Sequence, residues 1–311
     1  MQGRAGDPVL SRIAEALYWT GRYAERAEDT ARLLDVAQRA ALEGSDLGTS
    51  TTLAAVLGGP VVTGSRQDIL AHYGLDRLSP QSIASCVRAA RENARQIRDA
   101  LPSEMWESLN TWHLSVSAAS RSDLSGAGAH GFLAGMRTRA YTYTGCAEAT
   151  MLRTEGWSWL MAGRWLERLS FTTRVLAVRA PTLEEEGPGG GPYGWAVLLR
   201  ALSAYEAYRT TYRAVISPER VVELLLLDPD FPRSARSCAM RLEEALVVVA
   251  DEHVDGTARR LGGRLHGMLG FGSVDEVIAE GLGRYLDRVA QLTGAVHDAL
   301  TDEPFARGAT A

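Results

Sequence analysis

The sequence of 311 residues predicts an all-α protein that folds as one elaborate helical bundle. Apolar residues recur at spacings of three and four along nearly every long stretch, whereas the alternation typical of strands is scarce. Prolines and small polar residues stand where helices are expected to begin. In addition, a phrase at 21–34, GRYAERAEDTARLL, returns without a gap at 163–176 as GRWLERLSFTTRVL. These observations predict a helical protein with an internal pseudo-repeat.

The first half of the chain is expected to begin with a long helix. Asp7 and Pro8 suit a helix start, because proline is tolerated in the first turn. The periodic pattern then continues to about Leu42. Further helices are expected at 52–57, 66–73, 79–100, from 102 through Trp112, at 131–144 and at 147–180, with a turn rich in small residues at 120–129.

The second half is expected to follow a flexible loop at 184–194, EEEGPGGGPYG, which is the low-complexity stretch of the chain. Helices are expected beyond it at 195–215, 218–226, 234–251, 255–270 and 273–300, and flexible tails at 1–7 and 302–311. The loop does not cleanly separate the two copies of the phrase, which lie around 11–42 and 153–180. We therefore expect the whole chain, 1–311, to be a single domain.

The composition predicts a soluble cytoplasmic protein. Hydrophobic residues make up 46% and charged residues 23% of the chain, as in ordinary globular domains. No apolar run approaches the roughly 20 residues that span a bilayer, and the first residues lack the apolar segment of a secretory signal. A net charge of −5 also argues against nucleic acid as the main partner. Neither a membrane nor a nucleic-acid partner is expected.

Several chemistries are excluded by what the sequence lacks. All 33 basic residues are arginine, so a lysine Schiff base and a P-loop lysine are impossible. The three cysteines lie far apart and are expected to fill small spaces in the core. There is no HExxH or ExxH pattern and no nucleotide-binding motif. DEHVD at 251–255 is expected to be a polar helix junction. We therefore expect neither a metal site nor a bound cofactor.

The repeated phrase places matching charges on two helices. Arg22, Glu25 and Arg26 align with Arg164, Glu167 and Arg168, an offset of 142 residues. A helical wheel puts aromatic residues beside this charged stripe, which indicates that the stripe is at least partly enclosed. Buried charges must be paired, either within each helix at i, i+3 or between the two helices. The aligned glycines, Gly21 and Gly163, stand where a close crossing of the two helices would need a missing side chain.

Two interpretations of this stripe remain open. It could be a packing unit whose arginine–glutamate network fixes the register of the helices. Alternatively, it could line a polar pocket in which Glu25 or Glu167 acts as an acid or base. The arginines would then bind a carboxylate or phosphate of the substrate. These candidate binding residues are Arg22, Arg26, Arg164 and Arg168. Glu28 and Asp29 align with Ser170 and Phe171, so the first copy is the more polar and is favoured for chemistry.

A second dense group of polar residues lies at 88–110, where both asparagines of the chain fall. Its candidate substrate-binding residues are Glu92, Arg95, Trp106, Glu107 and Asn110. The alternative is an ordinary salt-bridged surface. Farther along, Arg233 or Ser234 stands near a helix start, where either could face an anion or Ser234 could simply cap the helix.

Seven phrases occur in order over about residues 8–300: SRIAEALYWTGRYAERAEDTARLLD, RENARQIRD, SEMWESLN, EGWSWLMAGRWLERLSFTTRVL, LLRALSAYEAYR, LLLDPDFPRSARSC and RLEEAL. These phrases closely resemble the bacterial alpha-E domain family, which is associated with circularly permuted ATP-grasp proteins. A small departure is Leu169, where the family usually has alanine after the second Glu-Arg pair.

This resemblance implies an all-helical partner of a circularly permuted ATP-grasp ligase, with a transglutaminase-like protein as a second possible partner. ATP-grasp enzymes activate a carboxylate as an acyl phosphate for attack by an amine, so ATP and Mg would be used by the partner. The chain itself would help to bind or position the substrate of amide or peptide bond formation. The alternatives are an enzyme that acts on an aminoacyl or amide substrate through a glutamate, and a purely structural interaction scaffold.

Overall fold

The computed structural model describes residues 11–42, 46–178, 180–181, 192–250 and 256–301. Within these ranges the chain forms 14 complete α-helices and no β-strand, which confirms the all-α prediction. None of the described helices is both long enough and apolar enough to cross a membrane. Both expected tails, most of the expected loop at 184–194 and the junction at 251–255 lie outside the described residues.

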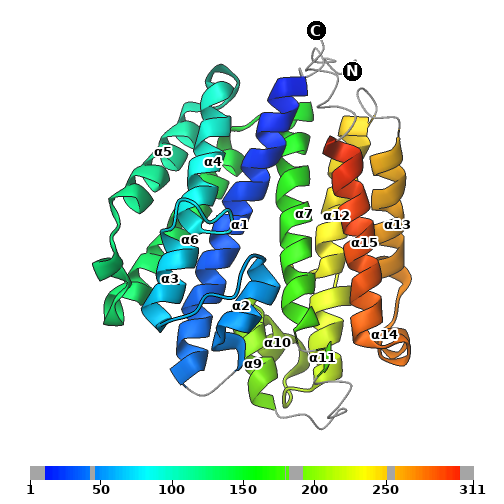
Figure 1. Cartoon of the computed structure of the whole chain (residues 1–311). Helices are drawn as coiled ribbons and strands as arrows, with labels where there is room; N and C mark the ends of the chain where they lie inside the picture. Colours follow the sequence, from blue (N-terminus) through cyan, green and yellow to red (C-terminus); the bar gives the residue numbers. More distant parts are fainter. Residues whose placement is uncertain (1–10, 43–45, 179, 182–191, 251–255, 302–311) are drawn as a thin grey trace.

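The first half of the chain forms a ring of four long helices. Helix α1 packs against α4 and α6, and α5 closes the ring by contacting both of them (Figure 1). The short helices α2 and α3 lie on the chain between α1 and α4. The bounds are α1 Ser11–Leu42, α2 Ser50–Leu57, α3 Arg66–Gly74, α4 Ile83–Gln96, α5 Ser103–Ala118 and α6 Gly126–Thr150.

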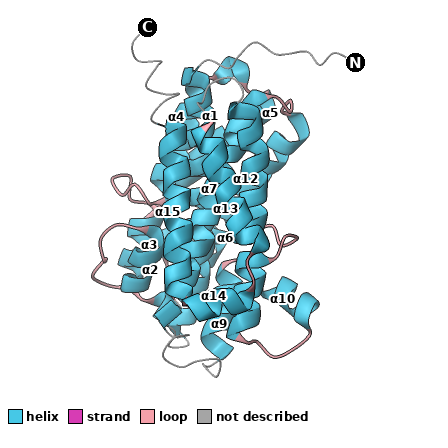
Figure 2. Cartoon of the chain, turned by 90° about the vertical axis from the view of Figure 1, so that its right-hand side faces the viewer, coloured by secondary structure: helices cyan, strands magenta, loops and turns pink. Residues whose placement is uncertain are grey.

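The second half forms a corresponding ring. Helix α7 packs against α12 and α15, and α13 contacts both of these helices. Figure 2, turned by 90°, shows α15 and α13 running along this side of the molecule, with α14 and α9 near one end. The bounds are α7 Glu155–Ala177, α9 Pro192–Ala201, α10 Tyr205–Tyr212, α11 Pro218–Val222, α12 Ala235–Ala250, α13 Thr257–Phe271, α14 Val274–Glu280 and α15 Leu282–Thr301.

Some helix boundaries differ from the prediction. The helix expected at 195–215 is broken after α9, where Ser203 has a left-handed backbone with φ 53°, and the helix expected at 273–300 is broken at Gly281, φ 94°. Conversely, α6 runs without a break through 145–146, and α9 begins at Pro192, within the expected loop. Periodicity reports which face of a segment is buried, and it continues across a short break when both pieces pack on the same core.

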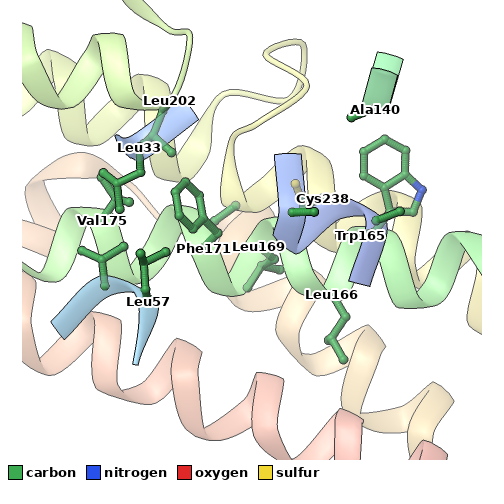
Figure 3. Packing of buried hydrophobic residues seen from close by; sticks show 14 of the residues in the cluster. Leu33, Leu57, Ala140, Trp165, Leu166, Leu169, Phe171, Val175, Leu202 and Cys238 are labelled. Atoms are coloured by element: carbon green, nitrogen blue, oxygen red, sulfur yellow. The ribbon is translucent and has the colours of Figure 1, made fainter. Parts of the chain in front are cut away.

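One continuous hydrophobic core runs through both rings. Figure 3 shows Leu33 from α1 near Phe171 and Val175 from α7, with Leu57 and Leu202 in the same part of the core. Of the three cysteines expected to fill small spaces in the core, Cys86 and Cys238 are free thiols buried in it, whereas Cys146 is a free thiol that is only partly buried.

The two rings meet along α1 and α7, where the backbones touch at two glycines. A Cβ atom on Gly21 would overlap the carbonyl oxygen of Leu160, and one on Gly163 would overlap that of Tyr18. Both distances fall well under the 3.0 Å below which Cβ contacts are essentially never seen. The glycines therefore occupy the predicted crossing, and no other residue fits there without moving a helix.

The crossing can be tested with Gly163→Ala. Since the added methyl group would meet backbone rather than a flexible side chain, we expect the free energy of unfolding to fall by roughly 3 kcal/mol, the upper end of usual overpacking costs. Urea denaturation followed by circular dichroism measures this. The matched control is Gly145→Ala in α6, where nothing lies within 4 Å of the new Cβ. That variant should gain up to about 1 kcal/mol. Equal stabilities of the two variants would contradict the close crossing.

Candidate functional site: a buried arginine–glutamate network

The charged residues of the repeated phrase pair between the two helices. Glu167 of α7 accepts hydrogen bonds from Arg22 Nε at 2.6 Å and from Arg26 Nε and Nη2 at 2.7 and 2.9 Å. Glu25 of α1 accepts them from Arg164 Nε at 3.2 Å and from Arg168 Nε and Nη2 at 2.5 and 3.0 Å. Each helix thus supplies the arginines that bind the glutamate of the other. Of the two pairings that the spacing allows, the structure uses the one between helices.

Both glutamates are nearly inaccessible, with exposed fractions of 4% for Glu25 and 1% for Glu167. Burial by itself would raise their pKa values. The surrounding guanidinium groups outweigh burial, Arg168 and Arg233 for Glu25 and Arg22 and Arg26 for Glu167. They lower the pKa of Glu25 to about 2 and hold that of Glu167 far below its ordinary range. Both side chains are therefore ionised carboxylates at neutral pH.

On the Glu25 side, two more carboxylates of α1 join the network. Oxygens of Glu25, Glu28 and Asp29 lie within 4.8 Å of one another. Arg233 donates hydrogen bonds to Glu28 and, at 2.6 Å, to Asp29, and its Nη2 lies 3.5 Å from Glu25. Three carboxylates this close are a possible set of metal ligands. Here the guanidinium of Arg233 supplies the positive charge that a metal ion would bring.

Arg32 completes this side, where it pairs with Glu28 and donates hydrogen bonds to Ser203 and, at 3.2 Å, to Tyr141. Burial and the charge of Arg233 lower the pKa of Arg32 to about 9. Burial, together with the charge of Glu25, raises the pKa of Asp29 to about 7, although Arg233 opposes the shift. Asp29 is thus a buried carboxyl group of this cluster whose pKa is raised into the neutral range.

On the Glu167 side, Arg22 reaches helix α15. Arg22 Nη1 lies 3.0 Å from the hydroxyl oxygen of Tyr18 and 3.3 Å from His297 Nδ1, and the Tyr18 hydroxyl lies 2.7 Å from the same nitrogen. A guanidinium can only donate, so Arg22 donates to the Tyr18 hydroxyl oxygen. His297 Nδ1 then accepts hydrogen bonds from the Tyr18 hydroxyl and from Arg22. Burial and the charge of Arg22 lower the pKa of His297, so its ring is neutral at pH 7.

Two cavities adjoin the network, one on each side of the crossing. The first has a volume of about 50 Å³, and its polar lining includes Glu25, Glu28 and Tyr143. The Tyr143 hydroxyl is buried and has no hydrogen-bond partner among the described residues. The second cavity lies between α1, α7 and α15 and has a volume of about 270 Å³. Its lining comprises Arg22, Arg26, Leu166, Ser170, Thr173, Arg174, Ala290, Thr293, Gly294 and His297.

The second dense group of the sequence forms a separate patch on α4 and α5. Glu92 pairs with Arg91 at 2.6 Å and with Arg95 at 2.8 Å, and Arg91 also donates to Asn110 at 2.9 Å. The guanidinium of Arg91 lies 5.4 Å from the Trp106 ring centre. The side chains of Glu92 and Arg95 are 42% and 60% exposed. Glu107 is exposed.

The structure therefore brings four of the five residues predicted in this group together, and the exposure of the Glu92 and Arg95 side chains favours the salt-bridged surface. No hydrogen bond or ion pair between described residues links the patch to the central network.

Sequence reasoning placed Arg233 near a helix start, where it could face an anion, but did not place it in the network. The chain reads LDRLSPQSIASC at 75–86 and LDPDFPRSARSC at 227–238, an offset of 152 residues that places Arg233 opposite Gln81. Ser234 does cap α12, because its hydroxyl accepts from Ser237 N at 3.0 Å. The anion that Arg233 faces is made by carboxylates of the same chain.

The two segments also share their hydrogen bonds. Ser82 and Ser234 each donate to the carbonyl oxygen of the aspartate six residues earlier, and each accepts from the backbone N–H three residues later. Cys86 and Cys238 each donate weakly to the proline carbonyl six residues earlier, at 3.5 and 3.8 Å. The same local sequence thus builds the same helix start in α4 and α12. For His297, by contrast, nothing in the sequence indicates a place beside Arg22.

These features define an all-helical protein in which two four-helix rings are joined by a buried arginine–glutamate crossing. The chain belongs to the Alpha-E family, described as a predicted alpha-helical domain with a conserved ER motif, which matches residues 9–305. Glu25-Arg26 and Glu167-Arg168 are two of the three Glu-Arg dipeptides in the chain.

Relatives include uncharacterised proteins of Mycobacterium bovis and Mycobacterium tuberculosis, each 27% identical over 328 aligned residues. The alignment covers 94% of this chain and 36% of each relative, so the chain spans about a third of their length. No solved structure matches the chain significantly.

Removing one carboxylate should destabilise the chain much more in the central network than in the surface patch. Glu167→Gln leaves Arg22 and Arg26 without their counter-charge, so we expect a loss of roughly 3 to 5 kcal/mol of unfolding free energy, as for other broken buried ion pairs. The matched control, Glu92→Gln on the exposed patch, should cost less than about 1 kcal/mol. Urea denaturation at pH 7 measures both. Similar losses would show that the two groups are energetically equivalent.

The pKa of Asp29 predicts a pH dependence of stability. It is raised to about 7 in the folded chain and is roughly 3.9 when unfolded. The folded state therefore binds the proton more tightly, and the stability contributed by Asp29 is present below about pH 4 and lost as the pH rises through 7. We expect the unfolding free energy of the wild type, minus that of Asp29→Asn, to fall by roughly 1 to 3 kcal/mol between pH 5 and pH 8. A difference that rises with pH would reverse the assignment.

Proposed function

We propose that this chain is the helical partner of a circularly permuted ATP-grasp ligase, and that it binds or positions a substrate for amide or peptide bond formation. The observation that carries the proposal is the state of Glu25 and Glu167, the candidate catalytic residues. Each is bound by arginines that hold its pKa far below neutral. A general base works best when its pKa lies near the working pH. These glutamates are thus suited to orienting arginines around a ligand rather than to moving protons.

The family resemblance supplies the partner. Alpha-E proteins are encoded beside circularly permuted ATP-grasp proteins or fused to them, and the relatives are about three times as long as the matched region. A fusion to a second protein would account for such additional length. In this arrangement ATP and Mg belong to the ligase, which activates the carboxylate. A transglutaminase-like protein is the second candidate partner.

We also infer that the two rings are an internal repeat. At an offset of 142 residues, Gly21 and Gly163 meet each other's helix, and Glu25 and Glu167 bind arginines at matching positions. At an offset of 152 residues, α4 and α12 begin with the same capped segment. A repeat of this kind gives a site with two similar halves, one of which can take a ligand while the other holds the fold together.

One observation favours the alternative that the chain is an enzyme acting on an aminoacyl or amide substrate. Asp29 has a pKa of about 7, which suits proton transfer. A purely structural scaffold is the least supported alternative, because cavities of about 50 and 270 Å³ adjoin the network.

Co-expression with the neighbouring ATP-grasp protein tests the proposal. We expect the two chains to co-elute at micromolar concentration on size exclusion, and ATP-dependent amide formation to require both. Two chains that elute separately and act independently would contradict the partnership.

The Asp29→Asn variant distinguishes a binding partner from an enzyme. If the chain only binds or positions substrate, amide formation by the complex with the variant should keep more than about half of the wild-type rate. An enzyme that uses Asp29 as its base should lose about 100-fold or more. The melting temperature of the variant serves as the control for folding.

A further inference from the structure

The larger cavity, between α1, α7 and α15, has an excess of positive charge. Arg22, Arg26 and Arg174 line it, and no acidic side chain is part of its lining. Behind these arginines lies Glu167, which is already bonded to Arg22 and Arg26. His297, also in the lining, is neutral at pH 7 because burial and Arg22 lower its pKa. Among the described residues, these three guanidinium groups form ion pairs with one carboxylate.

Arg174 is the least satisfied of the three. Its Nε donates to the carbonyl oxygen of Ser170 at 3.2 Å, and its Nη2 lies 3.8 Å from Glu167, beyond hydrogen-bond distance. Its terminal nitrogens make no hydrogen bond with any other described residue. The side chain is 39% exposed, compared with 25% for Arg26 and 11% for Arg22. A ligand that enters the cavity can therefore reach Arg174 from solvent and meet the two deeper arginines behind it.

The Glu25 side of the crossing has a carboxylate, Glu28, at a position where the Glu167 side has a serine. At the offset of 142 residues, Arg174 corresponds to Arg32 and Ser170 to Glu28. The Glu28 carboxylate pairs with Arg32 there, and the cavity beside it measures only about 50 Å³. The Ser170 hydroxyl instead donates to the Leu166 carbonyl at 2.8 Å and brings no charge. The Glu167 side thus keeps the arginines but has about 270 Å³ of space on the side where the carboxylate is missing.

We propose that this cavity binds an anionic group of a ligand, a carboxylate or a phosphate, which takes the part that Glu28 plays on the opposite side. Guanidinium groups suit both anions, because their paired N–H groups match two oxygens. This names the ligand chemistry of the substrate-binding role and rests on the proposed function for its biological meaning. Substrates with a carboxylate, and acyl phosphates formed from them, carry such a group.

The test is isothermal titration calorimetry of the full chain with inorganic phosphate and, separately, with acetate, at constant ionic strength set with chloride. We expect one-to-one binding of at least one probe, and the tighter probe identifies the group. Arg174→Gln should weaken binding about tenfold or more, since it removes a charge-assisted hydrogen bond. The control is Arg209→Gln in α10, which removes the same charge from a side chain that is 64% exposed. Its affinity should stay within about twofold.

Ser170→Glu is the decisive variant, because it places a carboxylate where the Glu28 side already has one. We expect it to abolish binding of both probes without lowering the melting temperature. Thr138→Glu, on an exposed position of α6, adds the same charge elsewhere and should leave binding unchanged. The proposal is overturned if the wild type binds neither probe, or if Ser170→Glu binds them as the wild type does.

These measurements use the chain without its partner, so they fail independently of the proposed function. If the chain binds an anion but does not co-elute with the ATP-grasp protein, only the proposed partnership is contradicted. A complex that forms while neither anion binds would contradict only the assignment of the cavity.

Discussion

The contact between α1 and α7 is the constraint on which the rest of this structure depends. Gly21 and Gly163 let the two backbones touch, and this brings the arginines of each helix within hydrogen-bond distance of the glutamate on the other. Buried ion pairs tolerate little displacement, because an unpaired charge in a protein interior is costly. The glycines and the ion pairs therefore fix one another, and together they set how the two four-helix rings lie.

The network is closely similar in its two halves at the crossing and different away from it. Beyond Glu25, the carboxylates of Glu28 and Asp29 balance Arg32 and Arg233. Beyond Glu167, the aligned positions hold Ser170 and Phe171, and the arginines face a cavity of about 270 Å³. The same helix geometry thus supports one side with four arginines and three carboxylates, and another side with three arginines and one carboxylate.

Much of the fold could be predicted from periodicity, but its breaks could not. The helices expected at 195–215 and 273–300 are interrupted, and α6 runs through a predicted break, because the apolar pattern reports burial and not the local backbone. The candidate site was predicted best where the sequence repeats itself. Neither Arg233 nor His297 could be placed in the network, because no local pattern brings the start of α12 or helix α15 beside α1.

The sequence by itself determined the all-α class, the glycine crossing and the six charged residues that pair across it. Helical spacing and a repeat without gaps are local properties that can be read along the chain. Only the tertiary structure decided that the ion pairs run between helices, that Arg233 joins the three carboxylates, and that the cavity beside Glu167 keeps an excess of arginine. The residues that make these ion pairs lie 139 or more positions apart in the sequence. Their distances depend on how whole helices pack, which no local pattern records.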